Sequence, residues 1–128
     1  MRAFAFLACL ALAAPAAAQP EWRQAREYEV LLSSFDIQPD PIRLKAGEPL
    51  RLRLTNNSTI SHSFNAEAFF AKSDVRPRER EITKRGRIEV AAGETREILL
   101  VPVKGRYSAR CGNLYHRLVG MRADIIVE

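Results

Sequence analysis

Cysteine, histidine and methionine are scarce in this chain, with two of each among 128 residues. Two cysteines cannot form the several disulfide bridges of a small secreted scaffold. Two histidines leave few side chains for metal binding or acid–base chemistry. Glycine (6 residues) and proline (7 residues) are also few, and 47% of the residues are hydrophobic, which argues against a collagen-like or disordered chain. The length suits one domain, so the positions of the scarce residues are the best guide to function.

Long apolar runs are also missing, except at the N-terminus. Arg2 is followed by an uninterrupted apolar run over residues 3–14, and then by Pro15 and three alanines. A basic start, a short apolar segment and an Ala-x-Ala site predict a secretory signal peptide over residues 1–18, cleaved after Ala18. A membrane anchor is the alternative reading, but the run is shorter than the ~20 residues that a spanning helix needs.

Cleavage would leave residues 19–128 as a single domain in an extracytoplasmic space, with no segment that inserts into a membrane. The loss of Arg2 would lower the formal net charge from +5 to +4. The mature chain would keep one cysteine, Cys111. Because that compartment is oxidising, a lone cysteine there is either a buried, inert side chain or a metal ligand.

Seven segments have the composition of β-strands and are separated by turn residues. They are residues 28–35, 42–45, 50–54, 87–90, 95–101, 105–111 and 121–127. Short strands at this spacing predict an antiparallel sandwich or barrel, with a turn at 56–58. Residues 66–72 break the pattern and predict one short helix with Asn65 as its N-cap. An exposed basic segment is expected at 75–81.

The scarce residues that survive cleavage form a recognisable donor set. Cys111, His116 and Met121 fall within eleven residues, on a predicted loop between the last two strands, and His62 lies about fifty residues upstream. Two histidines, one cysteine and a weak, distant methionine are the ligands of a type 1 copper site. Each residue alone has a structural alternative as a core cysteine, histidine or methionine. Jointly they predict a copper site.

The C-terminal segment resembles the ligand loop of the cupredoxins, the plastocyanin- and azurin-like family of small blue copper proteins. The family's Gly-x-Tyr-x-x-x-Cys strand matches Gly105, Tyr107 and Cys111, and the loop then carries His116 and Met121. The resemblance covers residues 28–128 and is greatest to short periplasmic bacterial members. It implies an all-β fold, a cupredoxin-like antiparallel Greek-key β-sandwich with one short helix.

The resemblance also implies one copper ion, with His62, Cys111 and His116 as equatorial ligands and Met121 as the axial ligand. This chain departs from the family in two ways. Ser63 follows the first histidine, where the family often has an asparagine that braces the loop. Four residues separate Cys111 from His116, and four more separate His116 from Met121. This combination of spacings is longer than in several well-known members.

The expected function is a periplasmic one-electron carrier that cycles between Cu(II) and Cu(I). The alternative is a copper chaperone or scavenger on the same fold, without electron transfer. An enzyme is not expected, because a single domain has no spare histidines for a second, catalytic copper. Electrons would pass through the edge of His116, near Leu114, Leu118 and Val119.

The expected partner is a redox protein, either a cytochrome or a copper enzyme, and the chain is expected to be a monomer that does not bind nucleic acid. The chain has a basic run at Arg76, Arg78, Arg80, Lys84, Arg85 and Arg87. This run is either a solvated loop or a docking patch for an acidic redox partner, because a basic surface steers such encounters.

Overall fold

The computed structural model describes residues 13–14, 18–113, 118 and 120–128. The predicted signal peptide lies largely outside the described residues, so its cleavage stays a prediction. His116, Leu114 and Val119 lie outside them as well. Within the part of the chain that is described, no helix combines the length and apolar character needed to cross a membrane.

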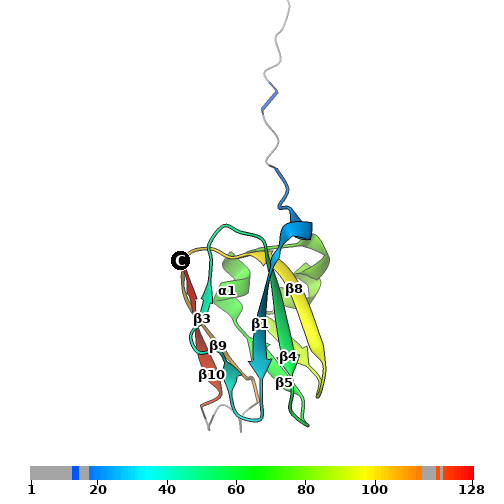
Figure 1. The fold of residues 1–128 in the computed structure, drawn as a ribbon, viewed down its shortest axis with the longest axis vertical. Helices are drawn as coiled ribbons and strands as arrows, with labels where there is room; N and C mark the ends of the chain where they lie inside the picture. The colour runs from blue at the N-terminus through cyan, green and yellow to red at the C-terminus, as the bar shows by residue number, and fades with distance from the viewer. Residues whose placement is uncertain (1–12, 15–17, 114–117, 119) are drawn as a thin grey trace, which may run out of the picture.

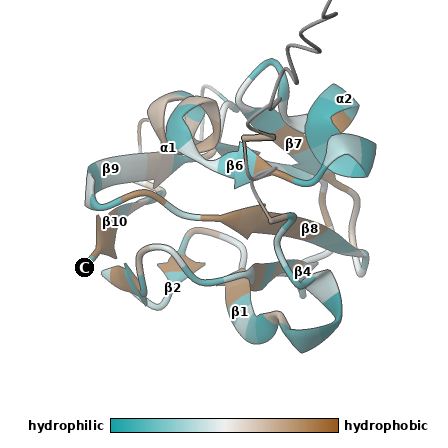
Figure 2. Cartoon of the chain, turned by 90° about the horizontal axis from the view of Figure 1, so that it is seen from above, coloured by the Kyte–Doolittle hydropathy of each residue, from teal (hydrophilic) through white to brown (hydrophobic). Residues whose placement is uncertain are grey.

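Two five-stranded sheets form the body of the molecule (Figure 1). The first sheet has the order β2–β1–β4–β8–β6, formed by Ile37–Gln38, Arg26–Leu32, Leu50–Asn56, Thr95–Val101 and Asp74–Val75. The second sheet has the order β3–β10–β9–β5–β7, formed by Ile42–Leu44, Arg122–Val127, Gly105–Arg110, His62–Asn65 and Arg87–Val90. Seen from above, β1, β2 and β4 lie in one layer and β7 and β9 in the other (Figure 2). The predicted all-β sandwich is confirmed.

Each sheet contains one parallel pair among otherwise antiparallel neighbours. β1 runs parallel to β4, with Val30 opposite Leu54. β3 runs parallel to β10, with Ile42 opposite Ile125. The reason is the chain path: after β2 the chain adds β3 to the second sheet and then returns to the first sheet as β4. Both sheets are therefore mixed rather than purely antiparallel.

The sandwich core follows from apolar residues at every second position of the strands. In β4, Leu50, Leu52 and Leu54 are buried, while Arg51 and Arg53 are half-buried on the other side. A side chain of this size contributes about 1.5–3 kcal/mol when it is fully buried. Fully buried side chains from both sheets meet between the layers, among them Val30, Leu32, Leu52, Leu54, Phe64, Val90, Ile98, Leu100, Ala109, Ala123 and Ile125.

The short helix α1, Glu67–Lys72, closes one side of the core with two phenylalanines. Phe69 meets Tyr107 of β9 edge to face, with ring centroids 5.6 Å apart. The helix was predicted, but its cap was not: Ala66 is the N-cap and makes no side-chain hydrogen bond. The prediction of Asn65 as the cap is wrong, because Asn65 ends β5 and pairs there with the neighbouring strands.

The segment between α1 and β7 is more ordered than the sequence suggested. It contains β6, a 3-10 turn η2 at Pro77–Glu79 and a second short helix α2 at Arg80–Thr83. Glu79 is buried and accepts a hydrogen bond from Arg76 Nε at 2.8 Å. Another 3-10 turn, η1 at Trp22–Gln24, precedes β1.

The strand predictions agree with the structure where apolar and polar residues alternate. Residues 87–90 and 95–101 form β7 and β8 with the expected bounds. The strand predicted at 105–111 is β9, which ends one residue before Cys111. The strand predicted at 121–127 is β10, which begins one residue after Met121. The predictions missed β2, β5 and β6, of which β5 begins at His62.

Candidate metal centre

Cys111 lies at the end of β9, where the β9–β10 ladder opens into the loop. Arg110 pairs with Arg122 as the outermost pair of the ladder. Beyond it, the Cys111 N–H donates to the Met121 carbonyl oxygen at 3.2 Å. Both side chains are buried, at 0% and 1% exposure. The hairpin thus fixes Cys111 and Met121 opposite each other, at the two ends of the predicted ligand loop.

His62 comes to the same place from the other half of the sequence. It is the first residue of β5, is 1% exposed, and pairs with Val90 across the β5–β7 ladder. β5 also pairs with β9, through Asn65 and Arg110. As a result, His62 Nδ1 lies 3.8 Å from Cys111 Sγ, although 49 positions separate the two residues.

This distance is a direct test of whether the two donors suit one ion. In a trigonal site with angles of about 120°, a metal–sulfur bond of about 2.3 Å and a metal–nitrogen bond of about 2.0–2.1 Å place the two donor atoms about 3.8 Å apart. The observed separation of Cys111 Sγ and His62 Nδ1 agrees with that value, and in the metal-free chain it is also a hydrogen-bond distance for sulfur. Sulfur and imidazole nitrogen are also the donors that copper favours. The two residues therefore fit a copper ion.

Of the other two predicted ligands, the structure describes Met121 only. The Met121 carbonyl oxygen accepts the Cys111 N–H, and the Met121 side chain is buried in the core. His116 lies outside the described residues. Among the residues that are described, no three histidine, cysteine, aspartate or glutamate side chains gather around one point. The four-residue ligand set stays a prediction, of which the structure brings His62 and Cys111 together.

Ser63 braces the start of the loop. Its side chain is 1% exposed, and its Oγ accepts a hydrogen bond from the Gly112 N–H at 2.7 Å. The same oxygen lies 4.0 Å from Cys111 Sγ, within reach of a weak sulfur hydrogen bond. Ser63 therefore fixes the residue that follows the cysteine. Contacts of this kind orient a ligand and tune its metal.

Gly112 is a site residue that the sequence analysis missed. A Cβ at this position would lie 2.7 Å from Asn65 Nδ2, 2.9 Å from Ser63 Oγ and 3.3 Å from one terminal nitrogen of Arg87. The backbone after Cys111 therefore passes directly over side chains of β5 and β7, and a larger residue here would have to displace them. A glycine directly after a candidate ligand cysteine was the available signal.

Asn56 holds the turn that leads to His62. It is completely buried, and its Nδ2 donates to the carbonyl oxygens of Ile60 at 2.8 Å and Val90 at 2.9 Å. Its Oδ1 accepts from the Ser58 N–H at 2.9 Å. The sequence analysis predicted only a turn here. In the structure the turn is tied to Val90, the residue that pairs with His62, so Asn56 helps to fix where the histidine lies.

Comparison with solved structures identifies the fold. Auracyanin A from Chloroflexus aurantiacus, described as a "blue" copper protein, matches with a TM-score of 0.56 at 19% identity, over 81% of this chain and 99% of the other. A reduced auracyanin from Roseiflexus castenholzii matches with a TM-score of 0.56 at 14% identity, over 81% and 98%. This chain has the cupredoxin fold.

The same fold occurs as one part of much larger proteins. The McoA multicopper oxidase from Aquifex aeolicus matches with a TM-score of 0.64 at 17% identity, over 87% of this chain but only 31% of the oxidase. No protein-family model matches this chain, and no curated protein matches it either. At these identities the likeness concerns the fold alone.

Proposed function

We propose that this chain binds one copper ion and serves as a periplasmic one-electron carrier. The observation that carries the proposal is the buried pair of Cys111 Sγ and His62 Nδ1, 3.8 Å apart at the loop end of a cupredoxin sandwich. His62, Cys111, His116 and Met121 would hold the ion. Copper would supply the change between Cu(II) and Cu(I). The chain supplies the donors, of which His62, Cys111 and Met121 are buried in the described part of the chain.

The residues around the donors support a carrier because they limit movement. Ser63 holds Gly112, Asn56 holds the turn before His62, and the β9–β10 ladder holds Cys111 against Met121. A site in which the donors cannot rearrange binds both oxidation states with little change in geometry. Burial also keeps water from the sulfur, which would bind as thiolate with its proton displaced by the metal.

The route of the electron belongs to the proposal as well. Leu118, at 78% exposure, places an apolar side chain on the surface within the ligand loop. An exposed apolar residue two positions after His116 in the sequence suits brief contact with a redox protein. We expect transfer through the edge of that histidine. A role as an enzyme is not proposed, because the sequence has two histidines and both are assigned to the one site.

Copper titration tests the site. Export of the full chain from a bacterial host would let the cell remove the predicted signal peptide, and mass measurement would show whether residues 1–18 are lost. Adding Cu(II) should give the intense visible absorption of a blue copper site and should raise the melting temperature, by mass action on the folded state. Cys111→Ser should abolish both effects, whereas Ser61→Ala, next to His62, should keep them. A colourless copper complex would contradict the proposal.

Stopped-flow mixing with a reduced periplasmic cytochrome separates the carrier from the copper chaperone. A carrier should accept one electron and lose its blue absorption. Tight Cu(I) binding without any electron exchange would favour the chaperone.

A further inference from the structure

The two outer faces of the sandwich differ in how their charges are balanced. On the first sheet, Arg51 pairs with Glu97 at 3.0 Å, and Arg53 pairs with Glu27 at 3.0 Å. The pKa of Arg53 is raised above its usual value, first by its hydrogen bond to Glu27 and then by the charge of that carboxylate. The arginines of β4 are thus neutralised within the molecule.

The basic run over residues 76–87, expected to be either a solvated loop or a docking patch, is also largely neutralised. Arg76 pairs with Glu79, Arg80 with Asp74 at 3.7 Å, and Lys84 with Glu81. These pairs, with that of Arg87 and Glu89, leave Arg78 and Arg85 without a carboxylate within ion-pair distance among the described residues. The run therefore carries less unbalanced charge than its sequence suggests.

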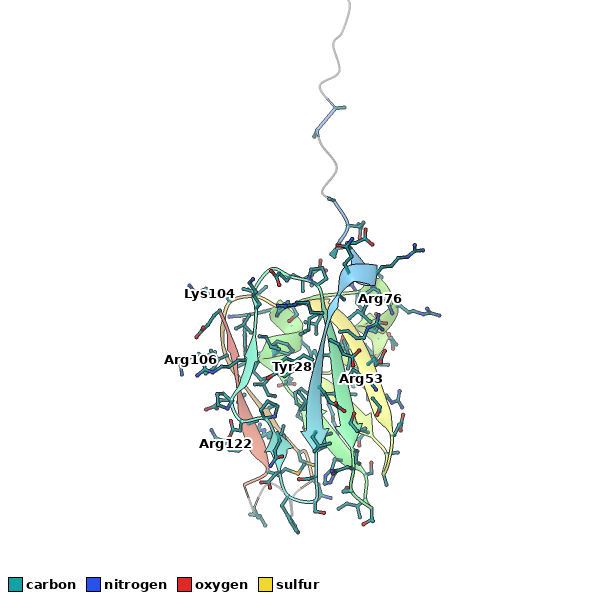
Figure 3. The ribbon with its side chains drawn as sticks, viewed as in Figure 1. Tyr28, Arg53, Arg76, Lys104, Arg106 and Arg122 are labelled. Atoms are coloured by element: carbon teal, nitrogen blue, oxygen red, sulfur yellow. The ribbon has the colours of Figure 1, made fainter. Side chains whose placement is uncertain are left out.

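On the outer face of the second sheet, arginines from neighbouring strands form a row that runs across the strands. The strand register places Arg122 of β10 beside Arg110 of β9, Arg110 beside Asn65 of β5, and Asn65 beside Arg87 of β7. All three arginines are exposed. Arg106 lies further along β9 on the same face, and Figure 3 shows Arg106 and Arg122 on the same side of the molecule.

Two of these arginines have no internal counter-charge. Arg122 pairs with Asp124 at 3.6 Å, and Arg87 pairs with Glu89. Within the described part of the chain, no carboxylate lies within ion-pair distance of Arg106 or Arg110. We name Arg85, Arg87, Arg106, Arg110 and Arg122 the arginine face.

Two recesses flank Arg110. One, of about 470 Å³, is lined by Arg85, Arg87 and Arg110 together with Asn65, Glu67 and Ser108. The other, of about 360 Å³, is lined by Arg110 and Arg122 with Ser108, Leu118 and Met121. A carboxylate that enters either recess meets at least two guanidinium groups, which bind carboxylates through paired N–H donors.

The arginine face borders the candidate metal centre. Arg110 is the residue before Cys111. A terminal nitrogen of Arg87 lies 3.3 Å from the position that a Cβ on Gly112 would take, so this guanidinium rests against the residue after the cysteine. A molecule bound on this face would lie directly beside the strand end that carries Cys111.

We propose that the arginine face docks an acidic patch on a partner protein, with aspartate or glutamate side chains in the two recesses beside Arg110. The face also contains Glu67, Glu89 and Asp124. These carboxylates divide the face into two short basic recesses. An extended nucleic acid or lipid surface would also meet the carboxylates, whereas a few aspartate or glutamate side chains can enter the recesses alone. That this partner is the redox partner rests on the proposed function; the binding itself does not need copper.

An octaglutamate peptide serves as the probe, added to the metal-free, exported protein and followed by two-dimensional NMR. We expect shifts of the Arg85, Arg106 and Arg110 signals at about 10 mM ionic strength and their loss at about 1 M, where screening shortens from ~30 Å to ~3 Å. The double variant Arg106→Gln/Arg110→Gln should weaken binding roughly 3- to 10-fold, as expected for the loss of two exposed charge contacts.

The control variant, Arg26→Gln/Arg96→Gln, removes the same charge from the strands of the first sheet and should weaken binding less than 2-fold. Equal weakening by both variants would mean that only net charge matters and would overturn the proposal. Binding of phosphatidylglycerol vesicles through the arginine face, without binding of octaglutamate, would overturn it in favour of a membrane.

Copper titration of the Arg106→Gln/Arg110→Gln variant separates this proposal from the proposed function. The variant should give the same absorption as the unmodified protein. Loss of peptide binding with normal copper binding supports docking on this face. Peptide binding by a protein that forms no blue copper site would leave the docking surface standing and refute the carrier.

Discussion

Replacing Ser63 with alanine removes the hydroxyl oxygen that accepts the Gly112 N–H at 2.7 Å. Ser63 is 1% exposed, and Gly112 is packed against Asn65 and Arg87, so water cannot easily take the place of the lost oxygen. An unsatisfied buried N–H costs about 1–3 kcal/mol. Because Gly112 is only part-buried, we expect a loss of about 1–2 kcal/mol in the free energy of unfolding.

Urea unfolding of the metal-free protein measures this loss, and Ser61→Ala is the matched control. Ser61 lies two residues away, and its hydroxyl contacts the Val90 carbonyl oxygen only at 3.5 Å, so its removal should cost less than about 0.5 kcal/mol. Copper titration of Ser63→Ala should show an altered visible spectrum, since Ser63 Oγ also lies 4.0 Å from Cys111 Sγ. Equal stability losses in the two variants would refute the bracing role of Ser63.

Two further predictions concern Asn56, which holds the turn before His62, and Gly86, which lies against α1. Asn56→Ala should destabilise the metal-free protein by about 1–3 kcal/mol in urea unfolding, because the Val90 carbonyl loses its short hydrogen bond from the buried Asn56 amide; a loss below about 1 kcal/mol would contradict this. Gly86→Ala should cost more than Gly93→Ala. Both have positive φ, but at Gly86 a Cβ would lie 2.5 Å from Glu67 Cα, whereas at Gly93 nothing lies within 4 Å. Melting temperatures compare the two, and equal shifts would mean that the contact with α1 is unimportant.

The strands that could be predicted from sequence are those with one buried face. Alternating leucine and arginine over 50–54 predicted β4, because a strand with one side in the core repeats every two residues. His62–Asn65 gave no such signal: His62, Ser63 and Phe64 are all buried, since the chain after Cys111 covers the outer side of β5. A strand buried on both faces does not alternate.

Asn65 shows how a local signal can be overruled by the tertiary structure. Its place before a short helix predicted an N-cap, which is a preference of neighbouring backbone groups. In the structure its backbone pairs with Arg87 and Arg110 of two other strands. Hydrogen bonds between strands that are far apart in the sequence hold Asn65 in β5. No local sequence pattern predicts such bonds.

The sequence by itself determined which candidate donors the chain offers and their order along it, because thiolate, imidazole and thioether are properties of residue types. It also determined the sandwich class, through strands that each bury one face. Only the tertiary structure decided that His62 Nδ1 lies 3.8 Å from Cys111 Sγ, that Ser63 holds Gly112, and that Arg110 lies between Arg122 and Asn65 on the second sheet. The physical reason is that distances between segments far apart in sequence depend on strand order and register, which packing of the whole core selects.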